Sequence, residues 1–222
     1  TITGQDPQLG ALADNGGPTQ TPLPNAGSPV IDAGDTTLTV DQRGVARPFG
    51  SADDIGAVEV DDTCPNSPWD VANEGELNFA IACYHTATAP GVYTINVTQD
   101  ITLAASTTVI DNANAGLELQ ILGAGNTVDG QGTAGVRPFE IAAGTLVKIG
   151  SLTVTGGNVT GVEAGGGILN HGNLSLSRCT IPGNQSGGGG GGSRSQGGAL
   201  TVEECMINAN QSGTDGGGIS NG

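Results

Sequence analysis

Short alternating runs of apolar and polar residues, separated by glycine-rich turns, fill residues 90–222. In segments such as 117–121 and 174–176 every second residue is apolar, which is the pattern of a strand with one buried face. Strands this short bury too little apolar surface to be stable alone, so successive segments must stack on one another. The pattern therefore predicts an all-β chain.

An internal repeat sets the geometry of the stacking. Residues 174–186 return as residues 200–212, and residues 152–158 take the place of 179–185 one coil earlier, at offsets of 26 and 27. Glycine clusters follow at 165–167, 187–192 and 216–218, where corners need a positive φ or close approach of two backbones. We expect a right-handed parallel β-helix, a solenoid with coils of about 25–27 residues. The matched pairs are Leu174 and Leu200, Cys179 and Cys205, Ile181 and Ile207, Asn184 and Asn210, Gln185 and Gln211, and Ser186 and Ser212.

One segment has helical periodicity, over about residues 73–85. Asn73 and Glu76 have the spacing of a capping box, and Leu77, Ile81 and Tyr84 then fall on one face, together with Ala80. A short helix before the first coil would cover the open end of the solenoid core. We therefore divide the chain into residues 1–62, a linker and capping helix over 63–89, and a parallel β-helix over 90–222.

Composition and charge narrow the function classes. The chain has 40 glycines and 11 prolines in 222 residues and only 3% aromatic residues, which excludes a helical bundle. Twenty-two acidic against six basic residues give a net charge of −16, so we expect no nucleic-acid partner. No apolar run is long enough to span a membrane, and residues 1–6 do not form a signal peptide. We expect an extracellular or cell-surface location, with the chain processed or cut from something longer.

Residues 77–222 resemble the start of a pectin-lyase-like β-helix of the kind found in bacterial surface proteins with an N-terminal CSLREA domain. Glu74-Gly75-Glu76-Leu77 stands where that domain has its Cys-Ser-Leu. The resemblance implies a prokaryotic-type secreted surface protein. It is carried by Leu77-x-x-Ala80-Ile81-Ala82, Ala89-Pro90-Gly91, residues 121–130, Arg137-x-Phe139-x-Ile141, residues 152–156 and the Gly-Gly-Gly-Ile-x-Asn repeats.

Residues 6–60 resemble the choice-of-anchor Q domain, which is normally the last part of such surface proteins. The end of one module therefore precedes the beginning of another. The matching segments are residues 6–10, 14–20, 27–35 and 41–44, Arg47-Pro48, and residues 54–59.

The four cysteines fit no zinc-binding or CxxC pattern. Cys64 and Cys83 flank the predicted helix, and we leave open whether they form a disulfide or stay free. Cys179 and Cys205 share one repeat position and should stack about 4.8 Å apart. Buried free thiols are favoured there over a disulfide.

Candidate chemistry is sparse. His85 and His171 lie in different contexts, and we find no Lys or Arg joined to an acidic cluster in the repeats, so we predict no catalytic residues and no enzyme. Asp53-Asp54 and Asp61-Asp62 are weak calcium candidates, with solvated turn carboxylates as the favoured interpretation. We expect Asp32, Asp35 and Asp41 to bond turn amides. Apart from calcium, no cofactor is expected.

The hypothesis for function is self-assembly. Thr1, Ile2 and Thr3 match the half-coils at 153–155 and 180–182, and Gly218, Ile219 and Asn221 match residues 167–170. We expect a structural surface protein, a stalk or filament unit, whose partner is itself in a head-to-tail homopolymer. The stacked units are either separate subunits or successive windows of one long repetitive polypeptide. The alternative is a polysaccharide-binding adhesin or a carbohydrate-active enzyme, with glycans as partners.

Overall fold

The structure is a computed structural model that describes residues 2–15, 17–25, 28–48, 52–60, 64 and 66–222. The chain forms two compact units, Thr1–Pro65 and Asn66–Gly222. Within the described residues no helix has the length and apolar character needed to cross a membrane.

Turns and loops make up the described part of the first unit. Among the described residues of this unit, strand pairing is limited to isolated antiparallel bridges that join Leu9 to Pro24, Ala13 to Thr21 and Val40 to Ala46. Val30 and Val58 are buried there beside buried carboxylates. Contacts of polar side chains therefore contribute much of the stabilisation of the first unit, whereas stacked apolar residues stabilise the second unit.

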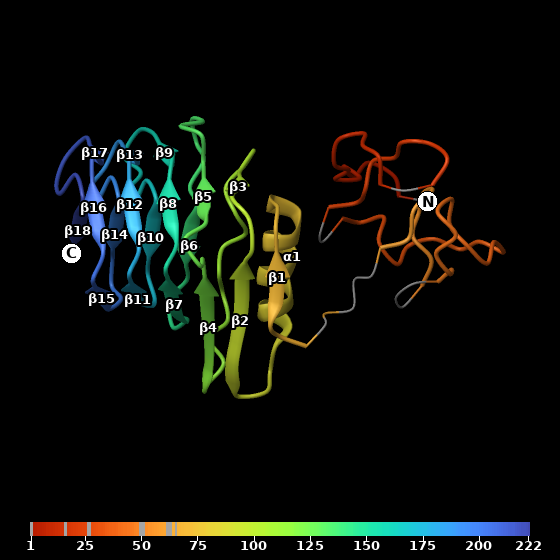
Figure 1. The fold of residues 1–222 in the computed structure, drawn as a ribbon, viewed down its shortest axis with the longest axis horizontal. Coiled ribbons are helices and arrows are strands. Elements are labelled where there is room, and N and C mark those ends of the chain that lie inside the picture. Colours follow the sequence, from red (N-terminus) through yellow and green to blue (C-terminus); the bar gives the residue numbers. More distant parts are fainter. Residues whose placement is uncertain (1, 16, 26–27, 49–51, 61–63, 65) are drawn as a thin grey trace. The chain divides into compact units, whose positions relative to one another are not determined.

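The second unit is a parallel β-solenoid (Figure 1), as the repeat predicted. Four sheets run along it, and within each sheet every strand pairs in parallel with its counterpart in the next coil. The six-stranded sheet contains, in order, β1 (Trp69–Val71), β2 (Gly91–Val97), β4 (Leu117–Leu122), β7 (Leu146–Gly150), β11 (Asn173–Ser177) and β15 (Leu200–Glu203).

The remaining strands form three smaller sheets. The five-stranded sheet contains β3 (Ile101–Thr102), β5 (Thr127–Asp129), β8 (Thr153–Thr155), β12 (Thr180–Pro182) and β16 (Met206–Asn208). The four-stranded sheet contains β6 (Phe139–Ile141), β10 (Ile168–Asn170), β14 (Ser193–Ser195) and β18 (Ile219–Asn221). The three-stranded sheet contains β9 (Asn158–Val159), β13 (Gln185–Ser186) and β17 (Gln211–Ser212).

The coil length matches the expectation in most coils and exceeds it in the middle of the solenoid. Leu176 pairs with Val202 at the same offset as the sequence repeat. Ile121 pairs with Ile149, and β6 pairs with β10, at larger offsets than the repeat predicts. The expected range of coil lengths was therefore too narrow. Corner loops absorb the additional residues, because the strands themselves stay in register.

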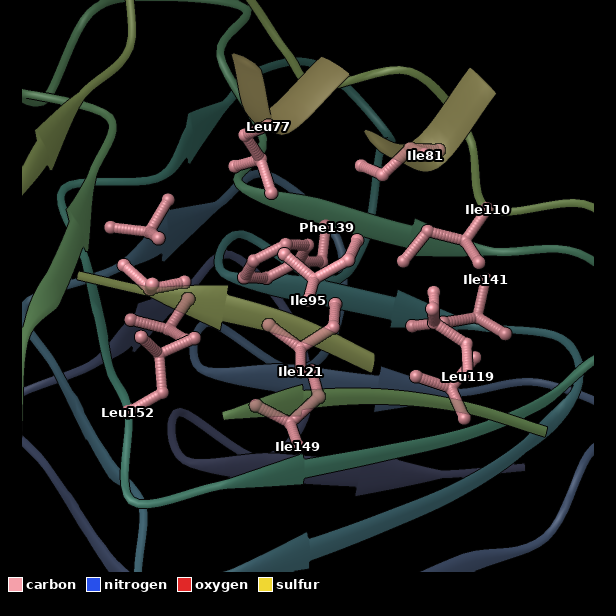
Figure 2. Packing of buried hydrophobic residues seen from close by; sticks show 14 of the residues in the cluster. Leu77, Ile81, Ile95, Ile110, Leu119, Ile121, Phe139, Ile141, Ile149 and Leu152 are labelled. Atoms are coloured by element: carbon pink, nitrogen blue, oxygen red, sulfur yellow. The ribbon is translucent and has the colours of Figure 1, made fainter. Parts of the chain in front are cut away.

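The core is a set of apolar ladders inside the coils. Ile95, Ile121, Ile149 and Leu176 occupy the same position in successive coils and are almost fully buried. Figure 2 shows the first three stacked beside Phe139. This packing explains the alternation seen in the sequence, since every second side chain of a strand points inward.

Helix α1 (Glu74–Thr86) lies against the β1 and β2 side of the solenoid (Figure 1). Asn73 caps it by accepting a hydrogen bond from the Glu76 N–H at 3.0 Å, and Glu76 in turn accepts from the Ala72 N–H at 2.7 Å. Leu77, Ala80, Ile81 and Tyr84 are all buried, as their spacing predicted. Figure 2 shows Leu77 and Ile81 above the core near Ile95. The helix therefore covers this face of the core.

Glycine is required at the corner around residues 190 and 191. Gly190 has φ +69°, a conformation that side-chain-bearing residues rarely adopt. A Cβ on Gly191 would lie 2.2 Å from the Gln211 carbonyl oxygen of the next coil. The glycine clusters therefore set how closely coils approach.

Candidate assembly face

The coil of strands β15 to β18, residues 200–221, exposes side chains that earlier coils bury. We call the outward side of this coil the β15–β18 face. Val202 is 38% exposed, whereas its register partner Leu176 is fully buried. Ile219 is 37% exposed at a position where Ser193 is fully buried. The face therefore presents part of the apolar ladder to solvent.

The same face also carries strand edges. β15, β16, β17 and β18 each stand at the edge of their sheet, with one neighbouring strand apiece. An edge strand presents backbone N–H and C=O groups that can pair with a further strand. A further coil could therefore satisfy both the apolar ladder and the backbone.

The opposite side of the solenoid is covered. Tyr84 of α1 packs edge-on to Tyr93 of β2 at 5.8 Å between ring centroids, and Tyr93 stacks on Trp69 of β1 at 6.0 Å. The Tyr84 hydroxyl is buried and has no hydrogen-bond partner among the described residues. Burial raises its pKa to about 12, with the charge of Glu118 as a smaller cause. Aromatic side chains of α1, β1 and β2 therefore cover this side of the solenoid.

Asparagine side chains join the coils near the β15–β18 face, with Asn184 buried and Asn210 partly buried. The Asn184 side chain accepts from the Gly157 N–H at 2.9 Å and donates to the Val154 carbonyl at 3.0 Å. The Asn184 N–H donates to Asn210 Oδ1 at 2.9 Å, which repeats the bond from Gly157 one coil further on. The ladder continues up to Asn210.

The cysteines divide into two pairs. Cys64 and Cys83 are each disulfide-bonded, whereas Cys179 and Cys205 are free. The Cys179 N–H donates to Cys205 Sγ at 3.3 Å, so the two residues are neighbours as the repeat predicted. Burial raises the pKa of the Cys179 thiol to about 11. Cys205 is only partly buried because it lies in the β15–β18 coil.

The predicted assembly residues lie in both units. Ile219 and Asn221 belong to β18, and Gly218 just before them accepts from the Ser193 N–H at 2.9 Å. Ile2 is partly buried and Thr3 is exposed. Thr1 lies outside the described residues.

Where they are described, the calcium candidates accept hydrogen bonds from backbone N–H groups, but Asp54 is buried, so the expectation of a solvated carboxylate was wrong there. The two Asp54 carboxylate oxygens accept from the Asp32 N–H at 2.8 Å and the Val60 N–H at 2.7 Å, and Asp53 accepts from the Thr36 N–H at 3.0 Å. Burial raises the pKa of Asp54. The described residues hold no cluster of metal-ligating side chains. Asp61 and Asp62 lie outside the described residues.

Asp41 is a buried carboxylate of the first unit with several hydrogen-bond partners. It accepts from the Glu59 N–H at 3.0 Å and the Val45 N–H at 3.0 Å, and it pairs with Arg43 at 2.8 Å. Burial opposes its ionisation, but these bonds outweigh burial and lower its pKa to about 2. Asp32 likewise accepts from the Ala52 N–H at 2.8 Å, so the predicted turn role is confirmed for both. No such bond is described for Asp35.

The structure corrects the statement that no basic residue joins an acidic cluster in the repeats. Arg137 pairs with Glu140 at 2.6 Å and with Glu163 in the next coil at 3.2 Å. Lys148 pairs with Glu118 at 2.9 Å. The pairs were missed because most of their members lie far apart in the sequence and meet only through coil stacking.

These ion pairs are structural. Arg137 also donates to the carbonyls of Gly165 at 2.9 Å and Ala164 at 3.1 Å, so it ties one corner to the next coil. Burial works against ionisation of Glu118, but hydrogen bonds from Gln120 and Lys148 outweigh it and lower the pKa of that carboxyl. Arg137 and Lys148 are therefore both paired with carboxylates of the solenoid.

A second acidic and basic group lies at a corner of the solenoid. Ser177, Arg178, Glu203 and Glu204 line an open groove of about 590 Å³. Arg178 and Glu204 have φ of +52° and occupy the same corner in adjacent coils. The groove was not predicted from the sequence, although the internal repeat places Arg178 beside Glu204.

The two histidines are bound to backbone. His85 Nε2 accepts from the Asp111 N–H at 3.1 Å, and His171 Nδ1 lies 3.2 Å from the Gln196 carbonyl. They come from different parts of the solenoid and do not share a site.

Comparison with known proteins yields no match to a protein family, to a curated protein or to a solved structure.

Proposed function

We propose that the protein is a structural solenoid unit that assembles head-to-tail through the β15–β18 face. The observation that carries the proposal is the exposure of Val202 and Ile219 on edge strands, at ladder positions that are closed in the preceding coil. Addition of a further coil removes this apolar surface from water and pairs the free strand edges. The partner is a second copy, so the product is a filament or stalk with no chemistry of its own.

The charge of the chain sets the conditions for assembly. Each copy carries a net charge of −16, so copies repel one another over distances near the Debye length. That length falls from about 10 Å at 0.1 M salt to about 3 Å at 1 M. Assembly through an apolar face should therefore increase with sodium chloride concentration.

A matched pair of variants tests the proposal. Val202→Asp places a charge on the β15–β18 face, whereas Val162→Asp makes the same change at a residue that is 95% exposed on the loop between β9 and β10. Light scattering and electron microscopy should show filaments for the unmodified chain and for Val162→Asp, and none for Val202→Asp. Far-UV circular dichroism checks that the solenoid stays folded. Equal assembly of both variants contradicts the proposal.

A second candidate function rests on the groove lined by Arg178, Glu203 and Glu204. Paired carboxylates beside an arginine can bind or cleave a glycan, as in the alternative of a polysaccharide-binding adhesin or a carbohydrate-active enzyme. All three side chains are exposed, so the groove is open to solvent. Titration calorimetry with neutral and acidic oligosaccharides, compared between the unmodified chain and Arg178→Ala, tests it. Heat that disappears in the variant supports this candidate, and no heat with any probe removes it.

A further inference from the structure

β16 offers the clearest place for an additional strand. It is the edge strand of the five-stranded sheet, and its Met206 is 59% exposed. Its central residue, Ile207, pairs with the fully buried Ile181 in β12. Val154 occupies the same inward position one coil earlier. The position therefore takes a β-branched aliphatic residue in each of these three coils.

Residues 2–4 have the sequence pattern of the segment that would follow, and Gly4 has the backbone conformation of its corner residue. Ile2-Thr3-Gly4 matches Val154-Thr155-Gly156 and Ile181-Pro182-Gly183. Gly4 has φ +73°, and the corner residues Gly156, Gly183 and Ala209 have φ of +66°, +66° and +53°. A Cβ on Gly4 would meet no atom within 4 Å, so neighbouring atoms leave room for a side chain there. Residues 3–6 are exposed and accessible to a partner.

We propose that residues 2–4 of a second copy add a parallel strand to β16, with Ile2 over Ile207 and Gly4 at the corner of Ala209. This proposal rests on the proposed assembly function and names the segment that docks. It continues the interface that β8, β12 and β16 already make between coils. Thr3 would then lie opposite Asn208, in the register by which Pro182 pairs with Asn208.

The proposed function is assembly between copies, so a second copy supplies residues 2–4. These residues follow the pattern of the half-coils that already stack in the sheet of β16 within one chain. Residues 2–4 and β16 carry no charged side chain, so the −16 charge of each copy is not concentrated at this contact.

Cross-linking between two separate variants tests the proposal. One variant carries Thr3→Cys and the other Asn208→Cys, each with Cys205→Ser so that the partly exposed native thiol does not react. After mixing at equal concentration and oxidation, a non-reducing gel should show a species of twice the chain mass. In-register partners on neighbouring strands come within disulfide range. Peptide mass spectrometry should identify the bond between positions 3 and 208.

The register control replaces Asn208→Cys by Gln211→Cys, which lies three residues further along the coil. Its yield should be roughly fivefold lower, because Cα atoms more than about 7 Å apart cannot be bridged without backbone movement. Equal yields overturn the register. If the bond does not form while the unmodified chain forms filaments, residues 2–4 are not the docking segment and the proposed function stands. Absence of both removes both proposals. A double variant, Thr3→Cys with Asn208→Cys, that closes as a monomer in dilute solution overturns the second copy as occupant.

Discussion

The two sides of the solenoid present the same ladder positions to different surroundings. On one side α1 and β1 cover the core, and Leu77, Ile81 and Tyr84 are fully buried against it. On the other side the β15–β18 coil leaves Val202, Met206 and Ile219 exposed. A coil of a repeat protein draws stability from both neighbours, so a coil with one neighbour is stabilised less. The covered side should behave as a core, and the β15–β18 face as a surface that becomes a core on assembly.

The largest expected difference comes from one substitution made on each side. Ile81→Ala removes a fully buried side chain under α1 and should lower the free energy of unfolding by about 2–5 kcal/mol. Ile207→Ala in β16 removes the same atoms from a partly exposed site and should cost about 1 kcal/mol in dilute solution. Denaturant unfolding followed by circular dichroism measures both. An equal loss of unfolding free energy in the two variants would contradict the difference between the covered side and the β15–β18 face.

The disulfide should affect the covered side alone. Cys64→Ser opens a loop of about 20 residues and should lower the free energy of unfolding by about 3 kcal/mol, because the unfolded chain gains freedom. Hydrogen exchange should rise in α1 and stay unchanged in β15–β18. Cys205→Ser, which breaks no disulfide, is the matched control. A reactive thiol at Cys83 in the oxidised native protein would contradict this expectation.

Thiol reactivity compares a closed coil with the open one. The raised pKa of Cys179, about 11, keeps its thiol protonated at pH 8, and burial shields it further. Since the thiolate is the nucleophile, iodoacetamide should modify Cys205 at least about tenfold faster than Cys179. Peptide mass spectrometry over time resolves the two rates. The rate of Cys179 modification should increase as the pH rises toward 11. Equal rates for the two cysteines at pH 8 would contradict a buried, protonated Cys179 beside an accessible Cys205.

The smallest effect concerns the hydroxyl of Tyr84 on the covered side. Tyr84→Phe removes a buried hydroxyl that has no described partner and should leave stability unchanged or raise it by up to about 1 kcal/mol. Tyr93→Phe is the control, because the Tyr93 hydroxyl donates to the Ala89 carbonyl at 2.9 Å and its loss should be slightly destabilising. Thermal unfolding measures both. A clear loss of stability in Tyr84→Phe would show that the hydroxyl has a partner.

The repeat made the solenoid predictable because coil stacking forces one residue type to recur at one position. Leu174 pairs with Leu200, and Ile181 pairs with Ile207, in the register that the sequence repeat predicted. The helix was equally clear from Asn73 and its buried face. β1 was missed, and its residues were placed in a linker, because so short a strand outside the repeats has no periodic signal.

The surroundings of the charged side chains were harder to predict. Arg137 meets Glu163 only after successive coils have stacked. A small shift in coil length changes which charges face each other. The exposure of Val202 was equally hidden, since its sequence pattern is that of the buried Leu176.

Hydrogen exchange of the full chain at low and at high concentration tests the central claim most directly. If the β15–β18 face is the assembly face, amide protection of residues 200–212 should rise with concentration and with sodium chloride, while α1 keeps the protection that it already has. Protection that is independent of concentration in residues 200–212, or that rises in α1 instead, would contradict the account.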